Sequence, residues 1–197
     1  YGYKTGRFDA SASYDIKALT LEGAYRHSKT DRTYREAEEV TLDGFTVAAM
    51  LHAKDWLNVR ASLDDSSRIP GGPDVTAATR LQADEAERDS TRVGVDVEVT
   101  PSSKVAFILS YVRREDEYTN PDAVAGVSGS AYGLIEAKYD SFTGEIDLTP
   151  SERLEIGAYY TYEKNLSTTQ AFSGGTTVLG LLNFAGSDET DTFGANA

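Results

Sequence analysis

The sequence predicts an all-β fold: an antiparallel, up-and-down transmembrane β-barrel, or a barrel segment of about eight or nine long strands. One turn phrase recurs at nearly even spacing, since Thr100-Pro101-Ser102-Ser103-Lys104-Val105 returns 49 residues later as Thr149-Pro150-Ser151-Glu152-Arg153-Leu154. Lys54-Asp55-Trp56-Leu57 holds the equivalent place earlier in the chain. About ten residues of alternating apolar and polar character flank each turn, and long polar stretches separate the units. Short turns, long loops and strands of membrane-spanning length are the layout of an outer-membrane barrel.

The first four predicted strands span residues 6–15, 18–28, 43–53 and 56–65. In each strand one face carries apolar, aromatic or small residues, as expected where one face of a sheet meets an apolar medium. The fourth strand shows the alternation most clearly, with Leu57, Val59, Ala61 and Leu63 on one face and Asn58, Arg60, Ser62 and Asp64 on the other.

The fifth predicted strand, residues 90–100, has the cleanest alternation, with Val93, Val95, Val97 and Val99 opposite Arg92, Gly94, Asp96 and Glu98. The sixth begins at Val105 and presents Phe107, Leu109 and Tyr111 on its apolar face. The seventh and eighth span residues 138–148 and 153–163, and a ninth begins near Thr192.

Strand length favours a membrane over a soluble sandwich. Ten tilted residues rise roughly 23 Å, which is about the height of the apolar band of an outer-membrane barrel. Strands of soluble sheets are more often about five or six residues long. A soluble β-sandwich or adhesin stays an alternative, and it predicts that the valine row 93–99 faces a second sheet.

The short turns are expected on the periplasmic side and the long loops on the extracellular side. The predicted long loops are residues 29–42, 66–89, 114–137 and 164–188. Within the second loop, Ala77–Arg88 is enriched in Ala, Leu and Glu, so it could form a short helix or a strand extension above the membrane.

The barrel hypothesis assigns each strand residue to lipid or lumen. Lumen-facing residues are predicted from the polar rows: Glu22, Arg26, Asn58, Arg60, Asp64, Arg92, Asp96, Glu98, Glu145, Asp147 and Glu155. Aromatic residues near strand ends are predicted to lie at the two membrane interfaces: Tyr14, Tyr25, Trp56, Tyr111, Tyr160 and Tyr162.

The amino-acid composition excludes some classes of partner and attachment. A formal net charge of −13 argues against a nucleic-acid partner, because phosphate binding needs clustered Lys and Arg. The chain has no cysteine, so it carries no disulfide and no thioether attachment for haem.

No catalytic set, cofactor site or metal site is predicted, and the chain is not expected to be an enzyme. His27 and His52 are interpreted as ordinary polar residues, and Asp64-Asp65 and Asp188-Glu189-Thr190-Asp191 as loop charge. Residues 1–197 are expected to be one barrel domain or part of one, with both ends inside strands.

Several stretches resemble the MtrB/PioB family of outer-membrane barrels, over roughly residues 43–194. The resemblance rests on Lys54-Asp55-Trp56-Leu57-Asn58-Val59-Arg60-Ala61-Ser62, Ala83-Asp84-Glu85-Ala86-Glu87-Arg88-Asp89, Val97-Glu98-Val99-Thr100-Pro101-Ser102, Leu148-Thr149-Pro150-Ser151-Glu152-Arg153-Leu154, Tyr159-Tyr160-Thr161-Tyr162-Glu163-Lys164 and Asp188-Glu189-Thr190-Asp191-Thr192-Phe193-Gly194.

The resemblance implies a function as well as a fold. Members of that family surround a multihaem c-type cytochrome and carry it across the outer membrane of Gram-negative bacteria for extracellular electron transfer. The expected partners are therefore outer-membrane lipid and a cytochrome in the lumen, with haem only in that partner. The family barrel is much larger, so this chain would supply only part of its wall. A general diffusion porin or a solute-specific channel stays the alternative function.

Overall fold

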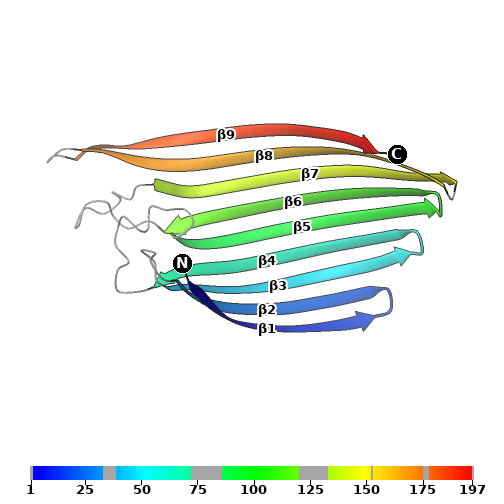
Figure 1. The fold of residues 1–197 in the computed structure, drawn as a ribbon, viewed down its shortest axis with the longest axis horizontal. Coiled ribbons are helices and arrows are strands. Elements are labelled where there is room, and N and C mark those ends of the chain that lie inside the picture. Colours follow the sequence, from blue (N-terminus) through cyan, green and yellow to red (C-terminus); the bar gives the residue numbers. More distant parts are fainter. Residues whose placement is uncertain are drawn as a thin grey trace.

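The structure is a computed structural model that describes residues 2–32, 39–71, 86–119, 133–151, 153–174 and 178–196. Nine antiparallel strands form one sheet in which each strand pairs with the next along the chain (Figure 1). The strands are β1 (Tyr3–Ile16), β2 (Leu19–Arg32), β3 (Glu39–Lys54), β4 (Leu57–Gly71), β5 (Glu87–Ser102), β6 (Val105–Thr119), β7 (Gly133–Ser151), β8 (Leu154–Gly174) and β9 (Val178–Asn196). This up-and-down order confirms the predicted fold class. Within the described ranges, no helix has the length and hydropathy needed to cross a membrane.

The strands are longer than the sequence predicts, mainly at the end away from the short turns. The predicted loop 164–188 is wrong over most of its length, because β8 continues to Gly174 and β9 begins at Val178. The loops predicted at 29–42, 66–89 and 114–137 are likewise too long at both ends. Glu87 and Arg88 extend β5, while residues 77–85 of the possible helix lie outside the described residues.

Several strand extensions escape sequence patterning because charged and hydroxyl residues replace a regular apolar alternation there. Cross-strand ion pairs and hydroxyl pairs take the place of apolar contacts there. Lys29 pairs with Glu39 at 2.7 Å, Lys164 with Glu189 at 2.6 Å, and the hydroxyls of Thr5 and Thr30 lie 3.1 Å apart. Such pairs support a ladder without any period-2 apolar signal.

The recurring turn phrase joins neighbouring hairpins at their closed ends. The Thr100 N–H donates to the Trp56 carbonyl oxygen at 2.8 Å, and the Thr149 N–H donates to the Lys104 carbonyl oxygen at 2.8 Å. Each threonine precedes a proline, which has no N–H to donate, and the pairing register shifts just there, between Val99 and Ser102 and between Leu148 and Ser151. His52 makes the matching bond to Ala18 in the first hairpin, at 2.7 Å.

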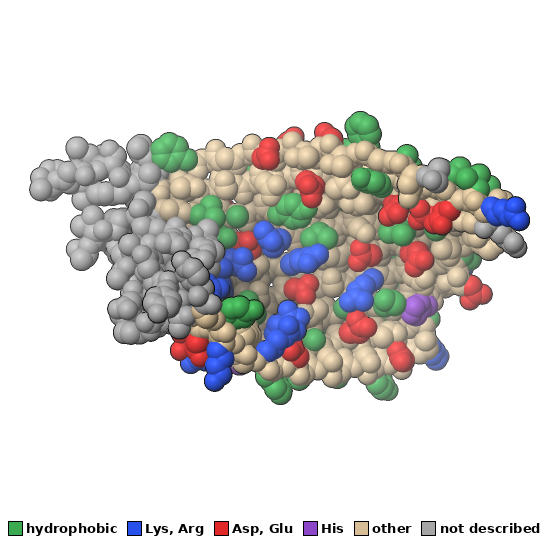
Figure 2. All heavy atoms as spheres, viewed as in Figure 1, with side chains coloured by type: hydrophobic (Ala, Val, Ile, Leu, Met, Phe, Trp, Pro, Cys, Tyr) green, Lys and Arg blue, Asp and Glu red, His purple; other side chains and the backbone are tan. Residues whose placement is uncertain are grey.

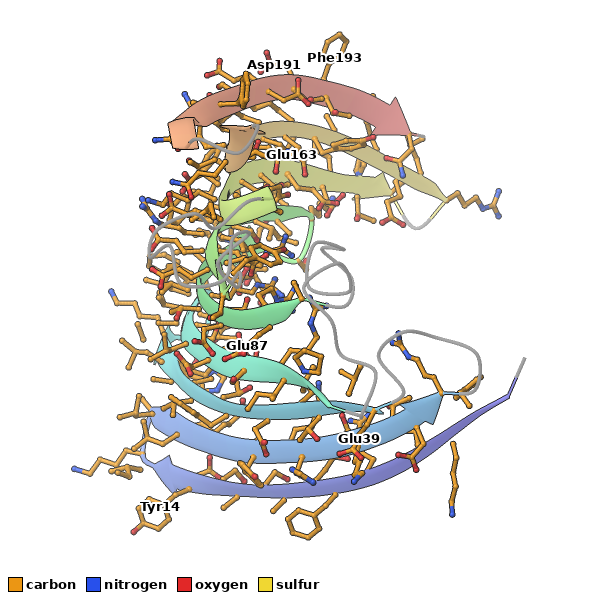
Figure 3. The ribbon with its side chains drawn as sticks, turned by 90° about the vertical axis from the view of Figure 1, so that its left-hand side faces the viewer. Tyr14, Glu39, Glu87, Glu163, Asp191 and Phe193 are labelled. Carbon is orange, nitrogen blue, oxygen red and sulfur yellow. The ribbon has the colours of Figure 1, made fainter. Side chains whose placement is uncertain are left out.

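The sheet curves into an open trough (Figure 3). The side chains of Tyr14 and Phe193 project outward from its convex face (Figure 3). β1 pairs only with β2 and β9 only with β8, so the described strands leave two unpaired edges and form a barrel segment rather than a closed barrel. Backbone groups on such edges need strand partners in a bilayer, because hydrocarbon offers no hydrogen bonds.

A conventional hydrophobic core is not present in the described part of the chain. Its buried residues are only Val40, Ala48, Ala86, Gly94, Asp116 and Gly157. Large apolar side chains in the middle of the sheet stay open, with Val93 41 % exposed and Leu109 45 % exposed. The soluble-sandwich alternative is therefore not supported, because the valine row of β5 meets no second layer among the described residues.

Close strand packing on the concave face predicts a position-specific glycine requirement. A Cβ at Gly44 would lie 3.1 Å from the Ser66 Cβ and 3.3 Å from the Asp65 carbonyl oxygen, whereas one at Gly23 would have no atom within 4 Å. Gly44→Val should lower the free energy of unfolding by about 1–2 kcal/mol through overpacking. Gly23→Val, the matched control, should leave it unchanged or raise it, because valine favours strands. Urea unfolding in lipid vesicles measures both, and equal losses would contradict this difference in packing.

Candidate functional site

The polar face of the sheet brings together all the residues that the sequence predicts to face a lumen. Cross-strand pairing runs from Arg60 to Asp96 and from Glu98 through Ile108 to Glu145, so these side chains project from the same side. The whole predicted set shares that side, which is the concave one: Glu22, Arg26, Asn58, Arg60, Asp64, Arg92, Asp96, Glu98, Glu145, Asp147 and Glu155. That this face lines a lumen stays a prediction.

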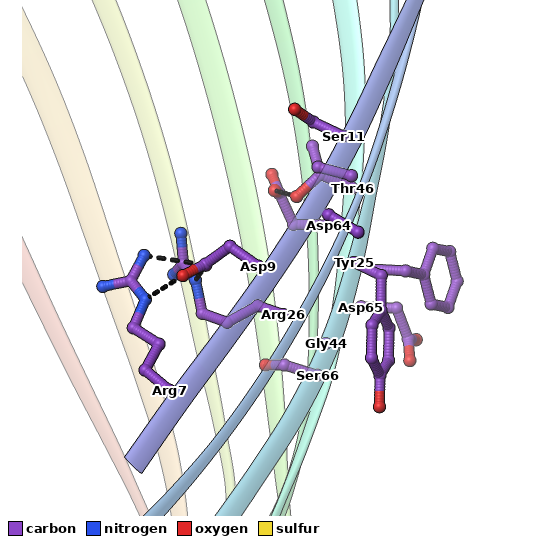
Figure 4. A pocket seen from close by; sticks show the side chains of 13 residues that line it. Arg7, Asp9, Ser11, Tyr25, Arg26, Gly44, Thr46, Asp64, Asp65 and Ser66 are labelled. Atoms are coloured by element: carbon purple, nitrogen blue, oxygen red, sulfur yellow. Dashed lines mark hydrogen bonds and ion pairs between the residues drawn. The ribbon is translucent and has the colours of Figure 1, made fainter. Parts of the chain in front are cut away.

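Charged side chains of both signs crowd this concave face (Figure 2). Asp9 lies between two guanidinium groups, accepting from Arg7 Nε at 2.5 Å and from Arg26 Nε at 3.2 Å (Figure 4). Further along, Arg60 pairs with Glu22 at 3.2 Å. Figure 4 also shows that Tyr25 and Asp65 project from the opposite side of the same strands.

One buried carboxylate on this face was missed by the sequence analysis. Asp116 is 1 % exposed, accepts from the Ser90 hydroxyl at 2.6 Å, and lies 3.3 Å from Arg114 Nε and 3.8 Å from Arg88 Nη1. The prediction placed Asp116 in a loop, whereas it lies within β6. Its Arg-Arg-Glu-Asp-Glu surroundings carry no apolar alternation that could have indicated a strand.

The opposite, convex face carries one continuous apolar band. A single row of paired residues crosses eight strands, through Leu19, Leu51, Val59, Val97, Leu109, Gly144, Tyr160 and Phe193. Five predicted interfacial aromatics also lie on this face, namely Tyr14, Tyr25, Tyr111, Tyr160 and Tyr162, while Trp56 lies in a turn beneath Lys54. Their position at a membrane interface stays a prediction.

A tyrosine–aspartate hydrogen bond recurs three times at the loop end of the apolar band. The hydroxyls of Tyr25, Tyr111 and Tyr160 donate to Asp43 at 2.8 Å, Asp140 at 2.7 Å and Asp191 at 2.6 Å. In each case a phenylalanine lies directly across from the tyrosine, and it belongs to an Asp-x-Phe sequence on the next strand: Asp43-Gly44-Phe45, Asp140-Ser141-Phe142 and Asp191-Thr192-Phe193. The repeated Asp-x-Phe is the signal that the sequence analysis overlooked. Asp64, Asp65 and the 188–191 cluster are strand residues, so their interpretation as loop charge is wrong.

The three tyrosines step along the sheet as a barrel requires. Followed strand by strand, the row of Tyr25 reaches β6 at Glu115, four residues from Tyr111. The row of Tyr111 reaches β8 at Tyr162, two residues from Tyr160. The belt of tyrosines thus shifts by one residue per strand toward the turns. With a rise of ~3.3 Å per residue and a strand spacing of ~4.8 Å, this stagger corresponds to a tilt of about 35°, which suits a barrel wall.

Beyond this tyrosine belt the convex face becomes charged. Lys138 pairs with Glu136 at 2.7 Å, and Arg113 pairs with Glu115 at 2.5 Å. The hydrogen bond from Arg113 lowers the pKa of Glu115, and the hydrogen bond to Glu189 raises the pKa of Lys164. Both shifts favour the charged forms, so this part of the wall is suited to water rather than hydrocarbon.

The two histidines lie on opposite faces. The His27 Nδ1 lies 2.7 Å from Asp43 on the convex side, and the His52 Nδ1 lies 2.7 Å from Asn58 on the concave side. In the part of the chain that the structure describes, no three His, Asp or Glu side chains are grouped so that they could hold a metal ion. The expected absence of a cofactor stays a prediction.

A curved sheet of long tilted strands, apolar on its convex face and charged on its concave face, is typical of the wall of an outer-membrane β-barrel. The chain belongs to the MtrB/PioB family, since the family model described as an outer membrane beta-barrel porin, MtrB/PioB, matches residues 1–197. This places the protein in the outer membrane of a Gram-negative bacterium and gives it a porin-like class. No curated protein matches the chain.

Two adjacent residues of β6 test the assignment of faces. Phe107 lies midway along the apolar stretch of β6, and Ala106 lies on the concave face opposite Asp147. Phe107→Arg should lower the unfolding free energy in vesicles by about 2–4 kcal/mol, because the guanidinium would face lipid. Ala106→Arg places the same group beside a carboxylate and should cost under ~1 kcal/mol. A reversed order of the two losses, measured by urea titration, would contradict the assignment.

Proposed function

We propose that this chain forms part of a barrel wall that sheathes a multihaem c-type cytochrome, so that electrons cross the outer membrane inside the barrel. The observation that supports this most directly is the division of the sheet into an apolar convex face and an exposed, charged concave face. Such a wall holds a polar, protein-sized interior apart from the lipid. The chain itself has no redox centre in this proposal.

The wall's contribution is mechanical and insulating. Covalent c-type haem attachment needs cysteine thiols, and the chain contains none. The haems would therefore belong entirely to the partner. The barrel would fix that partner across the bilayer, and its paired backbone would keep hydrocarbon away from the polar contacts between the two proteins.

A strip of small side chains on the concave face supports a protein occupant. Ala48, Ser62, Gly94, Val112 and Ser141 are successive cross-strand partners, and they form one row between charged rows. A Cβ at Gly94 would lie 2.9 Å from the Ser62 hydroxyl oxygen, which shows how closely the side chains approach there. Small residues let another protein surface come near the backbone, much as they do at close helix contacts.

A diffusion channel is the second candidate, favoured by the porin description of the family and by the exposed charges of the concave face. Charged residues in a water-filled lumen would then set ion selectivity. Planar-bilayer recording separates the candidates, since an open, ion-selective pore without a partner supports the channel.

Reconstitution with a decahaem cytochrome tests the sheath. Liposomes that contain the barrel and the cytochrome should pass electrons from an external reductant to an enclosed acceptor, and the two proteins should purify as a complex. Liposomes that contain either protein alone are the controls and should show no flux. Absence of both flux and complex would reject the sheath.

A further inference from the structure

Charge on the concave face of β5 is sorted by position along the strand. On β5 the tyrosine belt, followed at one residue per strand, falls at Gly94. Arg88 and Arg92 lie on the loop side of this level, and Asp96 and Glu98 lie on the turn side. The charge on the concave face of β5 therefore changes from positive to negative at the level where the apolar band of the convex face ends.

Neighbouring strands follow this division in part, since the acids Asp64, Asp116 and Glu163 also lie on the loop side and Arg60 lies on the turn side. The arginines on the loop side of the belt form what we call the basic collar: Arg7, Arg26, Arg32, Arg68, Arg88, Arg92 and Arg114, all on β1–β6. The acids on the turn side of β5, β7 and β8 form the acidic zone: Asp96, Glu98, Glu145, Asp147 and Glu155. Asp15 and Glu22 lie on the turn side of β1 and β2. Figure 2 shows the basic side chains gathered near the centre of this face, with acidic ones both among them and toward its turn end.

The basic collar retains excess positive charge. Arg92 and Arg114 are direct cross-strand partners, an arrangement of like charges that destabilises a sheet unless an anion lies near. Arg114 is already engaged with Asp116, while Arg92 makes no ion pair among the described residues. Asp64, the other cross-strand partner of Arg92, accepts instead from the Thr46 hydroxyl at 2.6 Å.

The acidic zone retains excess negative charge. In the described part of the chain, only Glu98 among its members accepts a side-chain hydrogen bond, from Asn58 at 3.3 Å. Arg60, the one arginine at this depth in the described strands, is paired with Glu22 at 3.2 Å. Because low-dielectric lipid surrounds this level, solvent screening is weaker here and the field reaches farther into the interior.

We propose that the concave face binds and orients one protein partner of opposite polarity, with a basic surface at membrane depth and an acidic surface at the level of the collar. This inference rests on the proposed function, in that the occupant is the protein within the barrel. Complementary potentials fix register and suppress the inverted arrangement. The charges of the wall would thus set the direction and depth at which the partner inserts.

Two photo-crosslinking peptides, hexalysine and hexaglutamate, test the polarity on the full chain refolded in detergent at low ionic strength. Hexalysine should crosslink to the turn-side halves of β7 and β8, and hexaglutamate to the loop-side halves of β5 and β6. The double variant Glu145→Lys/Asp147→Lys should weaken hexalysine binding by at least about tenfold while leaving the hexaglutamate crosslinks in place.

The matched control carries the same change of charge on the convex face, beyond the apolar band, as Glu87→Lys/Glu117→Lys. It should alter hexalysine affinity by less than about twofold. Equal weakening by both double variants would show attraction by net charge only, and it would overturn the inference, as would crosslinks spread over both ends or no binding of either peptide. Polarised peptide binding without a cytochrome complex would reject the proposed function alone, whereas a complex without polarised binding would reject this inference alone.

Discussion

The structure depends on one constraint: in hydrocarbon, every backbone N–H and C=O must find its partner within the sheet. The nine strands meet it by pairing strictly in chain order, with register shifts at only a few positions near strand ends. Two of those shifts lie beside Pro101 and Pro150, where the preceding threonine donates instead to the neighbouring hairpin. The unpaired edges of β1 and β9 are where the same constraint calls for further strands.

Because pairing satisfies the backbone, the side chains are free to perform two separate tasks. The convex residues are suited to contact with lipid, and their alternation with concave residues lets the concave face vary without a change in the apolar one. The three tyrosine–aspartate pairs mark the level at which the convex face changes from apolar side chains to ion-paired ones. The concave face changes sign at about the same level, from Asp96 to Arg92 on β5.

Alternation alone was enough to predict the central part of β1–β8 and the face on which each of its residues lies. The valine row of β5 and the polar row beside it are clear examples. Strand ends could not be predicted, because Lys29, Glu39, Lys164 and Glu189 stabilise the ladder by pairing charges rather than by burying apolar surface. Asp116 was missed for a related reason, since its surroundings combine Arg88 and Ser90 of the neighbouring strand with Arg114 of its own. No local sequence pattern indicates the identity of a partner.

The bonds between closed hairpin ends have a consequence for how such a wall is assembled. Ala18, Trp56 and Lys104 each accept an N–H from the hairpin that follows in the chain. A newly formed hairpin can therefore donate an N–H to a carbonyl oxygen of the preceding hairpin. This bond sets the offset between the two hairpins before their long strands pair. Growth can proceed one hairpin at a time from short-range contacts, which fold faster than distant ones. Each bond fixes the offset of one further hairpin, so the row of bonds at the turn end of the sheet sets the curvature of the finished wall.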